Sequence, residues 1–227
     1  MPSDLHMALQ SFYARRHGAR DEGRVEVEMD GYRADVLRGE VIYEIQTGSF
    51  TAIRDKLRAL AREHPVVLVH SIPRYKFIAH IDPDTGAELS CRRSPKQAQP
   101  VEVFGELVYA PDLLRRDNLS LEIVITAERE LRCDDGAGSW RRKGVSIVGR
   151  ELMAILEILR FDRPADLAGL LPAGLPEPFT TADLAEAGQM RSRLAGRMAY
   201  ALREAGAIEQ VGKRGRAYLY ERTGDAR

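Results

Sequence analysis

The sequence predicts an α/β protein with two parts. In residues 1–144, helix-forming and strand-forming segments alternate, whereas residues 145–227 have a mainly helical pattern. Three observations support this division: an amphipathic stretch opens the chain, three short strand-like segments joined by tight turns follow it, and the composition changes near Val145. A chain of 227 residues is long enough to build two domains.

The first element is a predicted helix over residues 3–17. Ser3 is a suitable N-cap, and Gly18 is suited to end the helix. Apolar residues recur at the spacing that places them on one helical face. These residues are Leu5, Leu9, Phe12 and Tyr13.

Three strands are predicted next, because β-branched and aromatic residues alternate with polar ones between turn signals. Asp30-Gly31 is a strong hairpin signal, and Arg38-Gly39-Glu40 provides a second turn. The predicted strands are Val25–Met29, Tyr32–Leu37 and Val41–Ile45.

A second helix and a buried strand complete the N-terminal pattern. Thr47-Gly48-Ser49 interrupts the third strand and can cap a helix whose apolar residues lie between Phe50 and Ala61. The apolar run Val66–Val69 after Pro65 is typical of a strand covered on both faces.

The middle of the chain gives weaker signals. Strands are predicted at 77–81 and 119–131, a turn at 82–86, a basic loop at 92–96 and a polar loop at 134–139.

A helix is predicted from Val145, because leucines and isoleucines recur there at helical spacing. They are Leu152, Ile155, Leu156 and Leu159. A loop rich in proline follows over 163–178.

Two further helices and a hairpin are predicted at the end of the chain. Thr180 and Asp183 form a capping-box pattern before a short helix, a longer helix covers 190–205, and a hairpin with a basic tip covers 208–221.

Composition excludes few functions. Lys and Arg together number 34, as do Asp and Glu, so net charge indicates no partner. Cys91 and Cys133 are far apart and lack partners at zinc spacing, which predicts free thiols in a cytosolic protein. No apolar run has the length of a membrane span, and the N-terminus lacks a signal-peptide pattern, so we expect a cytoplasmic location.

The strongest functional signal lies between residues 31 and 50. Glu44 and Gln46 are two positions apart on one predicted strand, so they point to the same face. Asp35 lies on the preceding strand and is beside Glu44 if the two strands pair. Two carboxylates at adjoining strand positions are suited to hold a divalent metal for phosphodiester cleavage.

Residues 3–70 resemble the PD-(D/E)XK, or restriction-endonuclease-like, nuclease superfamily, whose core has the order αβββαβ. Asp35 matches the acid of its second strand and Glu44 the acid of its third, whereas Gln46 stands where Lys is usual. This Glu-x-Gln variant is similar to competence-type and some restriction nucleases.

The resemblance implies that Asp35 and Glu44 bind Mg²⁺ or Mn²⁺ and that Gln46 orients the attacking water. Lys56 and Arg54 are two candidates for the positive charge that Gln46 lacks. Many relatives act as dimers, so a homodimer is also possible.

Residues 145–223 resemble a winged helix-turn-helix, and the whole chain resembles uncharacterised bacterial proteins that pair these two modules. A recognition helix reads base edges from its N-terminal residues, and a basic wing contacts phosphates or the minor groove. Between Arg191 and Arg222, eight basic and three acidic residues leave an excess of five positive charges. The candidate DNA contacts are Arg191, Arg193, Arg197, Lys213, Arg214 and Arg216.

Three functions therefore remain open. The first is a metal-dependent DNA endonuclease, the second a non-catalytic DNA-binding protein on a degenerate nuclease scaffold, and the third a protein-interaction adaptor. Secondary candidates have structural alternatives: a solvated loop and an interdomain core residue, which are at least as plausible as a nucleic-acid contact, and a buried histidine and an exposed acid, which are favoured over a functional role. The loop holds Arg92, Arg93 and Lys96, and the core residue is Trp140 beside Arg141–Lys143. The histidine is His70 and the exposed acid is Glu28.

Overall fold

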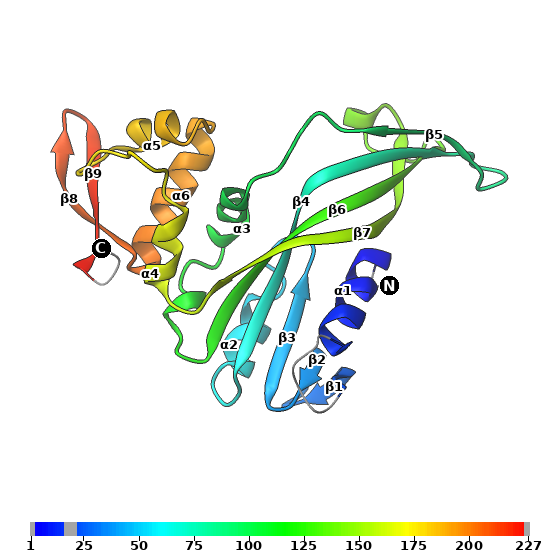
Figure 1. The fold of residues 1–227 in the computed structure, drawn as a ribbon, viewed down its shortest axis with the longest axis horizontal. Coiled ribbons are helices and arrows are strands. Elements are labelled where there is room, and N and C mark those ends of the chain that lie inside the picture. Colours follow the sequence, from blue (N-terminus) through cyan, green and yellow to red (C-terminus); the bar gives the residue numbers. More distant parts are fainter. Residues whose placement is uncertain (1–2, 16–21, 225–227) are drawn as a thin grey trace.

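The computed structural model describes residues 3–15 and 22–224 and has a mixed α/β fold (Figure 1). Its helices are α1 (Asp4–Arg15), α2 (Arg54–Leu60), α3 (Phe104–Leu107), α4 (Pro164–Leu167), α5 (Thr181–Ala187) and α6 (Ser192–Ala205). Its strands are β1 (Arg24–Met29), β2 (Tyr32–Arg38), β3 (Val41–Gln46), β4 (Val66–Ile81), β5 (Glu88–Arg93), β6 (Leu119–Asp134), β7 (Val145–Phe161), β8 (Ile208–Arg214) and β9 (Ala217–Arg222). Short 3₁₀ turns lie at Pro100–Val103, Leu113–Arg115, Trp140–Arg142 and Ala168–Leu170.

The first six elements, α1 to β4, follow the order that the sequence predicts. The predicted end of the first helix at Gly18 lies outside the described residues. Seven strands form one sheet in the order β1-β2-β3-β4-β6-β7, with β5 paired to the distal half of β4. The neighbours β3, β4 and β6 are parallel, and the other neighbouring pairs are antiparallel.

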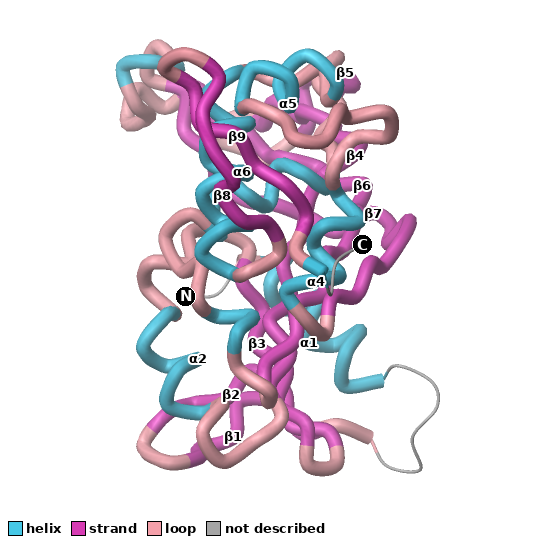
Figure 2. Tube along the Cα trace, turned by 90° about the vertical axis from the view of Figure 1, so that its left-hand side faces the viewer, coloured by secondary structure: helices cyan, strands magenta, loops and turns pink. Residues whose placement is uncertain are grey.

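Helices cover both faces of this sheet, as Figure 2 shows for α1 and α2. Alternation along β3 explains the two layers: Ile42 packs in the cluster with α2 and α3, whereas Ile45 packs in the cluster with α1. Leu5, Leu9 and Tyr13 recur every four residues on α1 and are fully buried against the sheet. The apolar face predicted for this helix is therefore confirmed.

The predicted helix from Val145 is wrong, because residues 145–161 form strand β7, which pairs with β6 over its whole length. Register shifts at three places on β6 leave three residues of β7 without a partner. Each shift lengthens the interval between residues on one face from two to three. Leu152, Ile155 and Ile158 therefore pack together against the α1 layer, at a spacing that resembles a helix.

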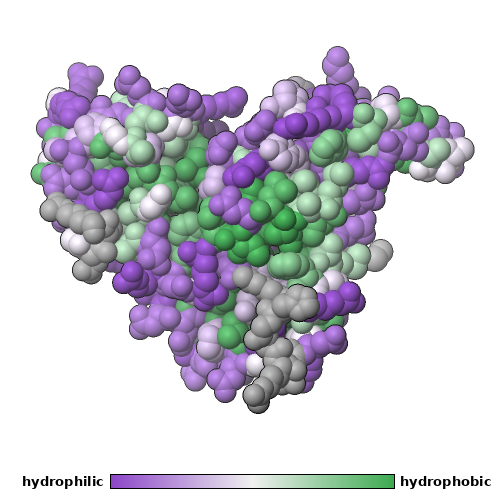
Figure 3. All heavy atoms as spheres, viewed as in Figure 1, coloured by the Kyte–Doolittle hydropathy of each residue, from purple (hydrophilic) through white to green (hydrophobic). Residues whose placement is uncertain are grey.

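The bulged residues of β7 are exposed, and they are Val148, Met153 and Leu156. Figure 3 shows hydrophobic side chains gathered on the face of the molecule that carries β7. The predicted division between residues 144 and 145 falls between two neighbouring strands of one sheet, because β6 and β7 lie on either side of it.

The C-terminal part consists of α4, α5, α6 and the hairpin β8–β9, close to the sequence prediction. The Thr180 side chain accepts from the backbone N–H of Asp183, and the Asp183 carboxylate accepts from the backbone N–H of Thr180, so the predicted capping box is confirmed. Gly206 ends α6 with φ of 86°, a conformation that favours glycine.

One hydrophobic cluster joins this part to the sheet layer. It extends from Leu57 of α2 through Phe104 of α3 to Met198 and Leu202 of α6. The C-terminal helices are thus placed by the same core that supports α2 and β3. Within the described residues, no helix combines the length and the apolar character needed to cross a membrane.

Candidate functional site

Asp35 and Glu44 meet where β2 separates from β3. The pairing of the two strands runs from Arg38 opposite Val41 only as far as Val36 opposite Tyr43. Beyond that point the backbone N–H of Ile45 donates to Asp35 Oδ2 at 2.7 Å, and the backbone N–H of Asp35 donates to Glu44 Oε1 at 3.3 Å. The two carboxylates therefore lie on adjoining strand positions, as the sequence predicts. Each accepts a hydrogen bond from a backbone N–H beyond the last paired residues of β2 and β3.

Lys56 provides a positive charge at this pair. Its Nζ lies 2.6 Å from Glu44 Oε2, and it also donates to the carbonyl oxygen of Arg33. Arg54, the other candidate, instead contacts Asp55 at 3.5 Å on the exposed side of α2. The structure thus selects Lys56 of the two cations that the sequence left open.

The surroundings of the Glu44 carboxyl disfavour its ionised form. Its side chain is fully buried, and burial together with the charge of Asp35 raises its pKa to about 7, although Lys56 acts in the opposite direction. Lys56 contacts the Glu44 carboxylate, and the neighbouring Asp35 repels that carboxylate when both acids are ionised. A bound cation would relieve this repulsion.

Gln46 lies two residues further along β3, and its side chain has a local partner. The amide nitrogen donates to the carbonyl oxygen of Ser49, and this hydrogen bond stabilises the turn between β3 and α2. The backbone carbonyl of Gln46 is 2.7 Å from Nδ1 of His70 on β4. His70 is buried, and burial lowers its pKa, so it has the structural role that the sequence analysis allowed for it.

His6 of α1 is a neighbour that the sequence analysis missed. Its Nε2 lies 3.5 Å from Asp35 Oδ1, because the first turn of α1 crosses the end of β2. The residue is one position from the buried Leu5, and no motif marks it. Among residues 3–15 and 22–224, no group of three or more histidines, cysteines, aspartates and glutamates lies close enough to hold a metal ion.

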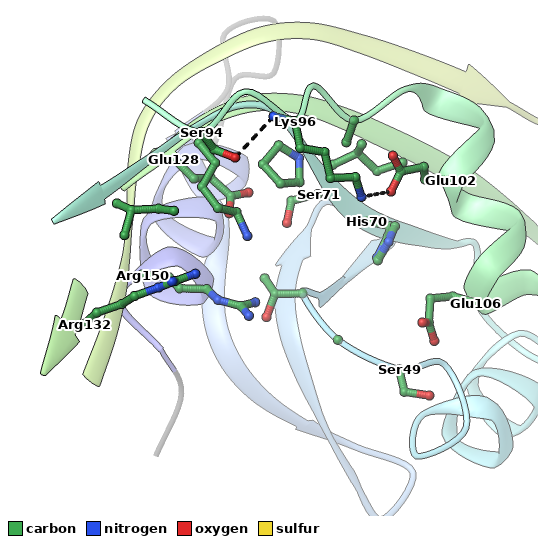
Figure 4. Close-up of a pocket in the computed structure, with 17 residues that line it drawn as sticks. Ser49, His70, Ser71, Ser94, Lys96, Glu102, Glu106, Glu128, Arg132 and Arg150 are labelled. Atoms are coloured by element: carbon green, nitrogen blue, oxygen red, sulfur yellow. Dashed lines mark hydrogen bonds and ion pairs between the residues drawn. The ribbon is translucent and has the colours of Figure 1, made fainter. Parts of the chain in front are cut away.

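A cavity of about 600 Å³ begins beyond the end of β3, under the extended halves of β4, β6 and β7 (Figure 4). Thr47, Gly48 and Ser49 form its edge nearest to Glu44, although neither Glu44 nor Asp35 lines it. Seven of the seventeen residues that line the cavity are charged, and Lys96 alone among them was a candidate from the sequence. They are Lys76, Lys96, Glu102, Glu106, Glu128, Arg132 and Arg150.

The predicted DNA contacts of α6 divide into two groups. Arg191 and Arg193 are exposed at the start of the helix. Arg197 instead donates to the carbonyl oxygen of Gly105 at 3.0 Å and to the hydroxyl of Tyr109 at 3.3 Å, so it holds α6 against α3. Arg197 has a packing role that its position on the helix did not reveal.

The basic residues of the hairpin, Lys213, Arg214 and Arg216, are exposed at the turn between β8 and β9. Arg214 lies 3.1 Å from Asp183, which connects the hairpin tip to the start of α5. The start of α6 and the hairpin tip lie at the same end of the C-terminal part (Figure 1). This arrangement gathers most of the predicted DNA contacts on one end.

Apart from the buried His70, the secondary candidates lie at the surface. Arg92 and Arg93 are exposed on β5, Glu28 is exposed on β1, and Lys96 contacts Glu102 at 2.8 Å. Trp140 is 83% exposed, so its interpretation as an interdomain core residue is wrong.

Comparisons with known proteins give a family but no activity. Residues 3–162 match a domain of unknown function, DUF8091, whose matched region ends where β7 ends. The chain is 34% identical over 220 residues to an uncharacterised protein of Treponema pallidum (strain Nichols), and the match covers 96% of this chain and 84% of that protein. No solved structure matches. Because the family model covers more than half of the sequence, the chain belongs to the DUF8091 family.

Proposed function

We propose that this protein is a metal-dependent DNA endonuclease of the restriction-endonuclease-like type, in which Asp35 and Glu44 hold Mg²⁺ or Mn²⁺. The single observation that supports this most is the placement of Asp35 next to the fully buried Glu44, which accepts from the Asp35 backbone N–H and pairs with Lys56 at 2.6 Å. Perturbed acids of this kind are candidates for functional groups.

The residues fit a divalent cation. Carboxylate oxygens are hard ligands that Mg²⁺ prefers, and Mg²⁺ keeps several waters when the protein offers only one or two acids. Burial and the charge of Asp35 raise the pKa of Glu44, and a bound cation would favour its ionised form. When bound, the ion would supply an activated water and charge stabilisation at the phosphate.

The protein's own groups would position the substrate and the water. Lys56 would offer its charge to the phosphate and replace the lysine that the motif lacks at Gln46. With its amide nitrogen held by Ser49, Gln46 would accept a hydrogen bond from a water through its amide oxygen.

The C-terminal part would deliver duplex DNA as a winged helix. Arg191 and Arg193 would read the groove, and Lys213, Arg214 and Arg216 would contact the backbone. Arg197 is left out of this surface because it packs against α3. A homodimer remains a further proposal, with exposed apolar residues of β7 as its candidate contact.

Cleavage of supercoiled plasmid DNA tests the catalytic part. We expect the wild type to cut in Mg²⁺ or Mn²⁺ and not in EDTA, and Glu44→Gln and Asp35→Asn each to cut at least about 100-fold more slowly. Glu28→Gln is the matched control, because Glu28 is exposed on β1, and it should cut normally. Cleavage by Glu44→Gln at the wild-type rate would exclude Glu44 as a ligand.

A second candidate is a DNA-binding protein without catalysis. It is favoured by the hydrogen bonds that both carboxylates already make to backbone amides, which give them a purely structural role. Fluorescence anisotropy with duplex DNA at several salt concentrations separates the two. Binding that Arg193→Ala weakens and Arg203→Ala does not, without cleavage in any metal, would support this candidate.

A further inference from the structure

The charged cavity beyond β3 is separate from the Asp35–Glu44 pair, and its lining has opposite character at its two sides. Figure 4 shows Arg132 and Arg150 on one side and Glu102 and Glu106 on the other. A volume of about 600 Å³ is within the usual range for a small-molecule site.

On the basic side of the cavity, three cations lie around one buried acid, Glu130. Glu130 is 3% exposed and accepts from Arg132 at 2.7 Å and from Lys76 at 3.1 Å, with Arg150 Nε at 3.9 Å. Three cations facing this carboxylate leave two positive charges. Guanidinium groups so placed suit the oxygens of a phosphate.

Glu128 is the other acid on this side, and its environment favours the neutral form. It is 3% exposed and accepts from the Thr126 hydroxyl at 2.7 Å. Burial raises its pKa against the influence of that hydrogen bond and of Lys76. Even with Glu128 ionised, the three cations exceed the two acids by one charge.

The acidic side has an unsatisfied acceptor. Oε2 of Glu106 is buried and has no hydrogen-bond partner among the described residues. An unpaired buried acceptor is unfavourable, and a ligand that donates a hydrogen bond would satisfy it. The nearby Glu102 carboxylate forms an ion pair with Lys96 at 2.8 Å.

We propose that this cavity binds a nucleotide, with its phosphate at Lys76, Arg132 and Arg150 and the amino group of its base at Glu106. A phosphate ester with a hydrogen-bond donor at its far end matches both sides of the cavity, and a nucleotide with an amino-bearing base has this form. The ligand is a free mononucleotide, or the same group at the 5′ end of a nucleic-acid strand. This site goes beyond the proposed cleavage reaction and needs no metal.

Calorimetric titration of the full chain in EDTA tests the proposal. The probes are guanosine 5′-monophosphate, guanosine and inosine 5′-monophosphate, which lacks the amino group. We expect the first to bind at least tenfold more tightly than either of the others, because each comparison removes the partner of one side. Equal affinity for guanosine and its monophosphate would overturn the proposal.

Two variants with a control locate the site. Arg150→Met should weaken binding of the monophosphate at least tenfold, and its fold should persist because Arg150 makes the longest of the three contacts with Glu130. Glu106→Ala should remove the preference for guanosine monophosphate over inosine monophosphate. Arg92→Met, an exposed change on β5 outside the cavity, should alter the affinity less than twofold. Wild-type affinity in Arg150→Met would contradict the site.

The source of the nucleotide is distinguished with oligonucleotides. A single strand with a 5′ guanosine phosphate that binds more tightly than the free monophosphate would assign the cavity to a strand end, and the reverse order would assign it to the free nucleotide. Both results support the site. The two proposals fail separately. The nucleotide site is tested in EDTA, and it also predicts that Glu44→Gln binds guanosine 5′-monophosphate with wild-type affinity, whether or not the protein cleaves DNA.

Discussion

Two acidic sites lie on the same sheet in opposite electrostatic settings. At the first, the buried Glu44 pairs with Lys56, and the charge of the half-buried Asp35 beside it opposes the ionisation of Glu44. Glu128 and Glu130 on β6 lie near Lys76, Arg132 and Arg150, so cations exceed acids by one even with both glutamates ionised.

The pKa values of the buried acids show the consequence. Burial and Asp35 raise the pKa of Glu44 to about 7, with one lysine opposing them. Burial also acts to raise the pKa of Glu130, but Arg132 and Lys76 outweigh it and the pKa falls below its usual value. A cation would therefore favour the ionised form of Glu44, whereas the cations around Glu130 already hold that acid in its ionised form.

The largest expected effect is the loss of the only lysine at the first site. At a pH above 7, where Glu44 is ionised in the wild type, Lys56→Met leaves the buried Glu44 without its cation, which we expect to destabilise the fold by up to about 4 kcal/mol in EDTA, measured by urea denaturation. Added Mg²⁺ should restore part of the loss by binding the native state. Arg54→Met on the same helix is the control. If Lys56→Met loses no more stability than Arg54→Met, Lys56 does not stabilise the buried Glu44.

The second prediction concerns pH. In metal-free buffer the native protein keeps Glu44 protonated up to about pH 7, whereas the unfolded chain releases that proton near 4.5. The native state binds more protons in this window, so the contribution of Glu44 to the free energy of unfolding falls as pH rises. At about 1.4 kcal/mol per pH unit over the interval from 4.5 to about 7, the upper bound is about 3.5 kcal/mol.

Glu44→Gln should remove this fall. The stability of the variant minus that of the wild type should increase between pH 5 and pH 8, as measured by chemical denaturation at each pH. A difference that stays constant across this range would show that Glu44 ionises normally in the native state.

These differences could be predicted from the sequence only in part. The acids of the first site lie on short strands joined by tight turns, so spacing alone placed Asp35 beside Glu44. Lys56 lies one helix away and was one of two candidates, because a helical pattern does not tell which cation faces the sheet. His6 carried no signal, since its proximity depends on how α1 crosses β2.

The second site depends on long-range pairing and could not be predicted. Lys76 lies opposite Glu128 in the register of β4 with β6, and Arg150 lies opposite Glu130 in that of β6 with β7. The register shifts also gave β7 a helical spacing, so the sequence analysis assigned Arg150 to a helix. Local patterns therefore predicted the hairpin site and missed the one built by distant strands.

The third prediction sharpens the contrast between the sites. Arg132→Met leaves Glu130 with Lys76 at 3.1 Å, so we expect a loss of about 1 kcal/mol, well below that of Lys56→Met. The double variant Lys76→Met with Arg132→Met should lose more than the sum of the single variants, because each cation compensates for the other. Additive losses in denaturation experiments would argue against a shared acid.

The smallest effect is expected at the rim of the cavity. Lys96 contacts Glu102 at 2.8 Å, but its side chain is 72% exposed, so water already solvates the charge. Exposed ion pairs contribute little, and Lys96→Ala should change stability by less than about 0.5 kcal/mol. A loss as large as that of Arg132→Met would mean that burial does not separate the strong from the weak ion pairs around this cavity, and the comparison of the two acidic sites would lose its physical basis.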